Sequence, residues 1–155
     1  MLEYIKTTII LVACLIILLT LFRLKSENIR KEMWGFLWSS FFLTLLLLLI
    51  FEFKPHHLLR EKLGISNLIT YLFYFVLFII YLLKYFNIII RINYFLIIIA
   101  FTFFGLANAV DLFSDGKLIV FNYSEIIEGT LHILGSVFWM MFFLDYLTGL
   151  KNKYL

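Results

Sequence analysis

The sequence contains one cysteine, one proline and few charged residues, and each shortage excludes a class of protein. Cys14 lies alone inside an apolar run, so it has no partner for an internal disulfide and is expected to pack as a small apolar side chain. Charged residues make up only 15% of the 155 positions, against 64% hydrophobic residues and a mean hydropathy of +1.03. This composition excludes a soluble globular domain, so we expect lipid to surround most of the chain.

Motifs that would name a reaction are also missing from the sequence. It has no His-Glu-x-x-His pattern and no cysteine pair, which excludes the common zinc motifs. No apolar segment carries the regularly spaced arginines of a voltage sensor. There is no repeat of fixed period, no low-complexity linker and no soluble domain. Function must therefore be inferred from where the few ionisable residues lie.

Five apolar segments are long enough to cross a bilayer. A hydrocarbon core of roughly 30 Å requires about 20 apolar residues in a helix, and fewer where flanking side chains reach the interface. The segments at about 4–22, 33–53, 67–83, 92–113 and 125–147 meet this requirement, and Lys6 in the first is expected to reach the interface. We predict an all-α, polytopic membrane helical bundle with a single domain over residues 1–155. A bundle of four spans, with one outer segment re-entrant or interfacial, is the alternative.

The connections between these segments also contain structural signals. Pro55 suits the first turn of a short interfacial helix between the second and third spans. Gly64 indicates a break after it, and Ser66 is suited to cap the third span. The link from Lys84 to Arg91 is short, so the third and fourth spans are expected to be antiparallel neighbours.

The basic residues predict an orientation rather than a nucleic-acid surface. A net charge of +3 would suggest nucleic acid in a soluble protein, but here the basic residues flank apolar segments, as topology determinants do. Eight of the 13 fall on one side of the predicted bundle: Arg23, Lys25, Arg30, Lys31, Lys84, Arg91, Lys151 and Lys153. Basic loops remain in the cytoplasm, so we predict the N-terminus outside and the C-terminus inside.

This orientation places most membrane-proximal acids and all three histidines on the outer side. The residues concerned end the second and fourth spans or begin the fifth, and they are Glu52, His56, His57, Asn108, Asp111, Asp115, Glu125, Glu128 and His132. At about 100° per residue, one face of the fifth helix, within an arc of roughly 80°, carries Glu125, Glu128, His132, Ser136 and Trp139. An arc of roughly 60° on the fourth carries Asn108, Asp111 and Asp115. Sequential antiparallel helices allow the two faces to converge.

These side chains are the ligand types of a divalent-cation site or of a proton relay. The predicted metal ligands are His132, Glu128, Asp111, Asp115 and Glu125, with polar support from Asn108, Ser136, Glu52 and His56. The competing interpretation is structural. The acids then lie in interfacial water or favour a helix dipole, His132 bonds to a neighbouring helix, and Trp139 belongs to the core.

Small residues on the last two spans predict close helix contacts. The fifth span carries Gly129, Gly135 and Ser136, and the fourth carries Ala100, Gly105 and Ala107. Such residues let two backbones approach and leave room for buried polar side chains. We therefore expect the His132 face to point into protein rather than into lipid.

Three functions fit this pattern. The first is a cation- or proton-linked channel, transporter or sensor, which we expect to be oligomeric because five short spans enclose little volume. The second is a non-catalytic subunit or oligomerising effector of a larger membrane complex, with the polar face as a docking surface for another membrane protein. The third is a membrane enzyme acting on a lipid or small hydrophobic substrate through Glu128 and His132. The enzyme hypothesis is the weakest, because neither a nucleophile triad nor a complete metal site is evident.

Overall fold

Five long helices and two short ones make up the computed structural model, which describes residues 2–24, 31–53, 55–115 and 123–154. The long helices are α1 (Leu2–Leu24), α2 (Lys31–Phe53), α4 (Asn67–Lys84), α6 (Tyr94–Asp115) and α7 (Ser124–Tyr154). The short helices are α3 (Pro55–Leu63) and α5 (Phe86–Ile89), and no described residue forms a strand. All five long helices are long and apolar enough to cross a membrane, which indicates a multi-pass membrane protein.

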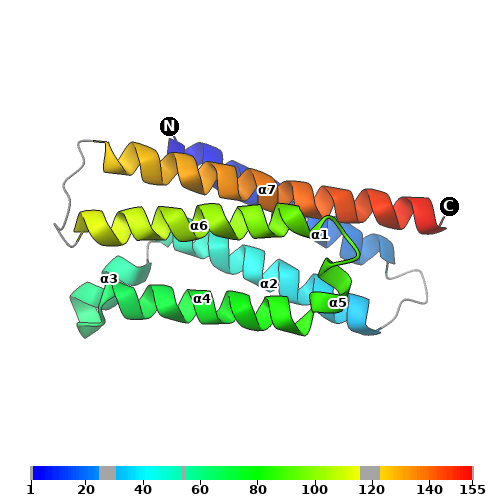
Figure 1. Ribbon diagram of the computed structural model, residues 1–155, viewed down its shortest axis with the longest axis horizontal. Helices are drawn as coiled ribbons and strands as arrows, with labels where there is room; N and C mark the ends of the chain where they lie inside the picture. The colour runs from blue at the N-terminus through cyan, green and yellow to red at the C-terminus, as the bar shows by residue number, and fades with distance from the viewer. Residues whose placement is uncertain (1, 25–30, 54, 116–122, 155) are drawn as a thin grey trace.

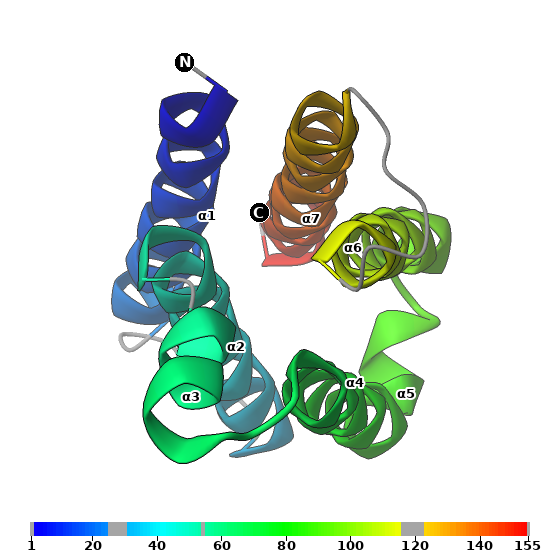
Figure 2. The same ribbon diagram turned by 90° about the vertical axis from the view of Figure 1, so that its left-hand side faces the viewer.

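The long helices run antiparallel in chain order, so the two termini lie at opposite ends of the bundle (Figure 1). We call the end that holds the start of α1, helix α3 and the start of α7 the N-end, and the opposite end the C-end. Seen along its axis, the bundle is a ring in the order α1, α7, α6, α4 and α2 (Figure 2). Helices α6 and α7 have the most extensive contact, and α4 and α6 are the antiparallel neighbours that the short link predicted.

The connection from α2 to α4 follows the local sequence closely. Pro55 occupies the first turn of α3, where its missing N–H costs no helical hydrogen bond. Gly64 follows the helix with a φ of 67°, a left-handed conformation that favours glycine. The Ser66 hydroxyl then accepts a hydrogen bond from the Ile69 backbone N–H at 3.4 Å, which confirms the predicted cap of α4.

Aromatic and hydroxyl side chains fill the centre of the ring. Trp139 is fully buried, as predicted, and its indole N–H donates to the Thr44 hydroxyl of α2 at 2.9 Å. The Ser40 hydroxyl of α2 and the Tyr81 hydroxyl of α4 are hydrogen-bonded at 2.7 Å. These bonds tie α2 to α4 and α7 where no water is available to satisfy polar groups.

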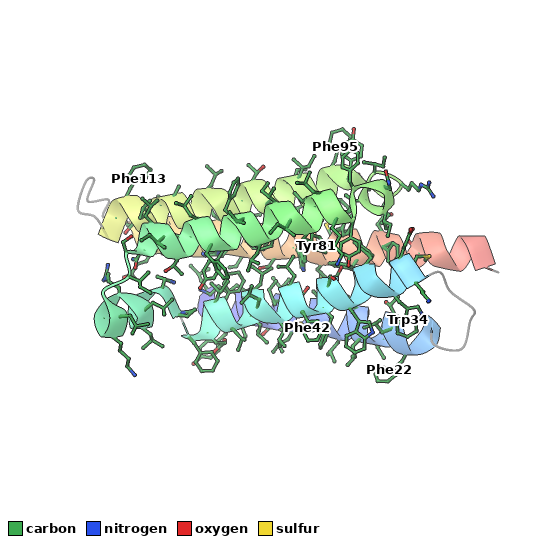
Figure 3. The ribbon with its side chains drawn as sticks, turned by 90° about the horizontal axis from the view of Figure 1, so that it is seen from below. Phe22, Trp34, Phe42, Tyr81, Phe95 and Phe113 are labelled. Atoms are coloured by element: carbon green, nitrogen blue, oxygen red, sulfur yellow. The ribbon has the colours of Figure 1, made fainter. Side chains whose placement is uncertain are left out.

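Large apolar side chains point away from the bundle along its length. Figure 3 shows Phe42, Phe95 and Phe113 on the outside, and all three are exposed in the isolated chain. Lipid is the solvent that would cover such side chains in a multi-pass membrane protein. Cys14 is buried and unbridged, in agreement with its expected role as a small apolar side chain.

Small residues bring α6 and α7 together at one of the predicted places. A Cβ atom on Gly135 would lie 2.6 Å from the Phe104 ring and 3.2 Å from the Ala100 carbonyl oxygen, so this glycine is required for the contact. The prediction is wrong for Gly105, which is exposed and has no atom within 4 Å of an added Cβ. Gly129 instead faces Leu2 of α1. The difference arises because α7 packs against both α6 and α1.

Candidate functional site

A small, partly enclosed cavity at the N-end gathers ionisable side chains from four helices. Its polar lining consists of Lys6 from α1, His56 from α3, Tyr71 from α4, Asn108 and Asp111 from α6, and Glu128 and His132 from α7. Ile50 and Phe51 of α2 complete the wall, so every long helix of the ring contributes to it. The volume is about 20 Å³, which is room for one water molecule.

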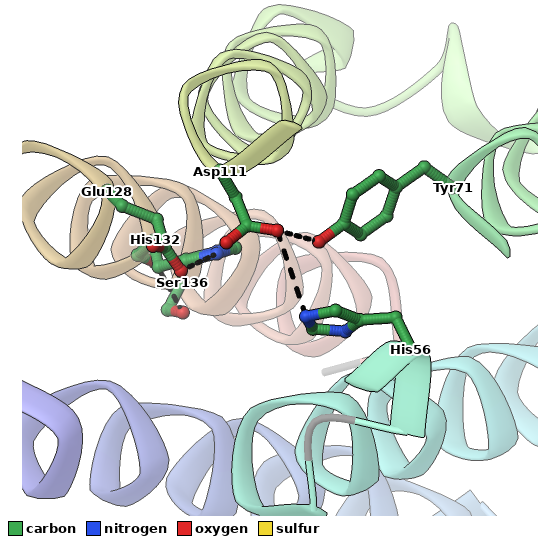
Figure 4. Close-up of polar contacts among 6 residues, drawn as sticks. All are labelled: His56, Tyr71, Asp111, Glu128, His132 and Ser136. Carbon is green, nitrogen blue, oxygen red and sulfur yellow. Dashed lines mark hydrogen bonds and ion pairs between the residues drawn. The ribbon is translucent and has the colours of Figure 1, made fainter. Parts of the chain in front are cut away.

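Asp111 connects three helices on one side of this cavity (Figure 4). The Tyr71 hydroxyl of α4 donates a hydrogen bond to its Oδ2 atom. The His56 Nε2 atom of α3 lies 3.7 Å from the same oxygen. The Asp111 side chain is 14% exposed. A carboxylate with so little water needs polar partners to stay ionised, and the Tyr71 hydroxyl and the His56 imidazole are two of them.

Glu128 and His132 form a second pair on α7, one helical turn apart (Figure 4). The His132 Nε2 atom is 3.6 Å from the Glu128 Oε1 atom, and the His132 residue is only 6% exposed. The other ring nitrogen, Nδ1, is buried and has no hydrogen-bond partner among the described residues. The ring packs at 4.8 Å against Phe51, measured between ring centroids. The structural interpretation expected His132 to bond to a neighbouring helix. The carboxylate that lies near its ring, that of Glu128, belongs instead to the same helix, α7.

Lys6 lies inside the bundle rather than at the interface. It is 4% exposed, lines the cavity, and places its Nζ atom 5.4 Å from the centre of the Phe51 ring, a cation–π distance. The expectation that Lys6 reaches the interface is therefore wrong. The face of α1 that carries Lys6 is buried where α1 packs against α2 and α7, so the ammonium group meets protein instead of headgroups.

The remaining predicted residues lie around the cavity without lining it. Glu125 is exposed in the first turn of α7, as the dipole interpretation allowed. Glu52 is exposed and accepts a hydrogen bond from the Thr7 hydroxyl at 2.6 Å. The buried Ser136 hydroxyl donates to the His132 carbonyl oxygen at 2.7 Å. Asp115 ends α6, but its side chain, like that of His57, lies outside the described part of the structure.

Two of the cavity residues, Lys6 and Tyr71, did not emerge from the sequence analysis. A signal for Tyr71 exists, because Asn67, Thr70, Tyr71 and Tyr74 follow the i, i+3, i+4, i+7 spacing of one helix face. Lys6 had a weaker signal, namely a cation at the third residue of an apolar segment on the side of the predicted acids. Nothing in the sequence distinguishes a lysine that turns inward from one that reaches the interface.

The arrangement is one of pairs rather than of a chelating cluster. Within residues 2–24, 31–53, 55–115 and 123–154, no three His, Cys, Asp or Glu side chains are grouped so that they could hold a metal ion. Two carboxylate–imidazole pairs, Asp111 with His56 and Glu128 with His132, line the cavity together with one ammonium group. Such groups can hold, share and pass on protons.

Residues 4–146 match the family model described as Domain of unknown function (DUF8692). The chain belongs to this family. The matched region includes every side chain that lines the cavity. No curated protein and no solved structure matches the chain.

Proposed function

We propose that this chain is a proton-linked membrane protein, a channel, transporter or sensor, in which the N-end cavity takes up and releases protons. One observation carries the proposal: five ionisable side chains of both signs, Lys6, His56, Asp111, Glu128 and His132, line one small cavity within a bundle of membrane-spanning helices. Ionisable groups inside a membrane are costly and are characteristic of ion and proton pathways.

Charge balance favours a proton as the exchanged species. With both carboxylates ionised, Asp111 and Glu128 carry two negative charges, and Lys6 supplies one positive charge. One protonated imidazole would neutralise the remainder, and each carboxylate already has a histidine nitrogen within 4 Å. Since a net charge is expensive in a medium of low dielectric constant, the cavity is suited to bind one proton and to lose it when a partner moves.

The size of the cavity argues against the other functions considered. A space of about 20 Å³ holds a water molecule but not a lipid or another hydrophobic substrate, which disfavours the enzyme hypothesis. A divalent cation would need several of these side chains to point at one ion, whereas they form two separate carboxylate–imidazole pairs. The nearby ammonium group of Lys6 would also repel the cation. The polar groups also face the interior, and this disfavours their use as a docking surface for another membrane protein.

The predicted topology adds a direction to the proposal. If the N-terminus lies outside, as the basic residues favour, the cavity opens near the outer leaflet and exchanges protons with the outside.

Nitrogen NMR of the histidine side chains tests this proposal directly. The chain has three histidines, so protein labelled at histidine and placed in lipid nanodiscs gives few signals, and His→Gln variants assign them. We expect an imidazole of the cavity to change protonation as the pH is varied. Glu128→Gln should alter that titration, whereas Glu125→Gln, an exposed position on the same helix, should leave it unchanged. If the cavity imidazoles of His56 and His132 both keep one neutral form over the whole pH range studied, the proposal is overturned.

A further inference from the structure

A second hollow lies far from this cavity, on the outer surface between α2 and α4 toward the C-end. It is an open groove of about 330 Å³. The part of the groove nearer the middle of the bundle is apolar and is lined by Leu43 and Leu46 of α2 and by Leu77 and Ile80 of α4. The part nearer the C-end carries the polar groups of Ser39, Lys84 and Tyr85.

We propose that this groove is a binding site for one anionic phospholipid, with an acyl chain along the apolar part and the phosphate group at Lys84. The groove runs along the two helices, which is also the direction of lipid chains in a bilayer. From Lys84 to Leu77 the rise is roughly 10 Å at 1.5 Å per residue. Its polarity follows that of a phospholipid, from a cation at the membrane surface to leucines nearer the membrane centre.

Lys84 is placed to recognise a phosphate. It ends α4 in an exposed position, and its Nζ atom lies 5.2 Å from the centre of the Tyr85 ring. Within the described part of the chain, no carboxylate lies at ion-pair distance from Lys84. The positive charge is therefore available to an anion, and basic sites between membrane helices are known to select anionic headgroups.

The hydroxyl groups beside Lys84 add hydrogen-bonding capacity to the same end of the groove. The hydroxyl of Ser39, on α2, and that of Tyr85, directly after α4, are hydrogen-bonded to each other at 2.7 Å. Either hydroxyl can be the donor, and the one that accepts keeps its own O–H for another acceptor. A phosphate or glycerol oxygen of the lipid is a suitable acceptor. A helix of a second copy could fill the apolar part but would bury the Lys84 charge, so we assign the groove to lipid.

Native mass spectrometry of the full, delipidated chain in detergent tests this site. Phosphatidylglycerol and phosphatidylcholine with identical acyl chains are titrated separately, and bound lipids are counted. We expect one phosphatidylglycerol to bind about fivefold more tightly than phosphatidylcholine, and Lys84→Gln to abolish this preference. Lys84→Arg should retain it, as should Lys62→Gln, which removes an exposed cation of α3 at the other end of the bundle. Inorganic phosphate should not displace the lipid, because it lacks the acyl chain.

Several outcomes would overturn the assignment. Equal binding of the two lipids, or an unchanged preference in Lys84→Gln, would show that Lys84 does not select a headgroup. Displacement by inorganic phosphate would show an anion site without a lipid chain. A lipid-free dimer that dissociates when the groove is filled by Leu77→Trp would identify a second copy as the occupant. The test is independent of the proposed proton site, because the two sites share no residue.

Discussion

Lys6 gives the N-end cavity a positive charge that the pattern of acids and histidines alone does not suggest. Without it, Asp111 and Glu128 would place two negative charges beside two imidazoles, an arrangement suited to a divalent cation. With the ammonium group present, one proton restores neutrality. A single buried side chain therefore moves the interpretation from metal binding to proton binding.

Gly135 provides a residue-scale test of the packing that holds α6 against α7. Gly135→Ala would place a methyl group 2.6 Å from the Phe104 ring, which is itself buried and cannot easily move. We expect the variant to lose about 1–3 kcal/mol of unfolding free energy, the usual cost of overpacking. Reversible unfolding in mixed micelles measures this loss. Gly105→Ala, on the exposed face of α6, is the matched control and should not be destabilised.

At the residue scale, the sequence predicts which groups lie near one another better than how each is oriented. Asp111, Glu128 and His132 were predicted from helix periodicity and do line one cavity. Glu125 shares the same predicted arc but lies in the exposed first turn, where the bundle no longer covers the helix. The rotation of α1 depends on its packing against α2 and α7, which is why the position of Lys6 could not be predicted.

At the scale of elements, α3 is a short helix that forms part of the cavity wall. Only nine residues long, it follows α2 directly and contributes His56 to the lining, whereas Leu58 and Leu63 are exposed. The His56 imidazole of α3 contacts the Asp111 carboxylate of α6, and the Tyr71 hydroxyl of α4 donates to the same carboxylate. A change in protonation at Asp111 or His56 would therefore act first on α3.

Tyr71→Phe tests this coupling. The variant removes the hydroxyl that donates to Asp111, so the carboxylate loses a hydrogen bond and its contact with His56 of α3 is expected to weaken. We predict faster hydrogen exchange of the α3 backbone amides, by roughly threefold to tenfold, the effect of losing about 1 kcal/mol. Tyr74→Phe on the same helix is the control, since Tyr74 does not line the cavity. Unchanged exchange in α3 after Tyr71→Phe would show that Asp111 does not hold this helix.

The existence of α3 and its cap could be predicted because the signals are local. Pro55, Gly64 and Ser66 each act within one turn of their own position, and all three behave as expected. The short helix α5 was not predicted, because residues 86–89 have no comparable signal. Close approach through small residues depends on distant partners, and here the prediction was correct for Gly135 and wrong for Gly105.

At the scale of the whole molecule, five long helices place the termini at opposite ends of the bundle. The five membrane-length helices followed from hydrophobic length alone, since the cost of unpaired backbone groups in lipid leaves few alternatives to a helix. Helix α7 extends to Tyr154, beyond the predicted end of the last apolar segment at 147. The ring order of the helices and the shared cavity could not be predicted from hydrophobic length, because both depend on contacts between residues far apart in sequence.

The predicted orientation can be tested with the chain's own cysteine removed. In a Cys14→Ala background, single cysteines introduced at positions 2 and 152 are labelled in intact cells with a membrane-impermeant maleimide. We expect labelling at the N-terminal position alone, because the basic residues favour a cytoplasmic C-terminus. Labelling at the C-terminal position alone would invert the topology and place the cavity near the cytoplasmic leaflet. Labelling at both positions would place both termini outside, which is impossible with an odd number of spans.

The most direct test of proton exchange in the cavity is infrared spectroscopy of the carboxyl groups in lipid nanodiscs, comparing Lys6→Met with the wild type. The variant removes the positive charge that balances Asp111 and Glu128, so we predict about one additional protonated carboxyl group per chain in neutral buffer. That signal should disappear when Asp111→Asn or Glu128→Gln is added, and Lys62→Met, at an exposed position of α3, should not produce it. If Lys6→Met is folded and both its carboxyl bands and the protonation of its cavity imidazoles match those of the wild type, the cavity does not balance its charge with protons and the account is contradicted.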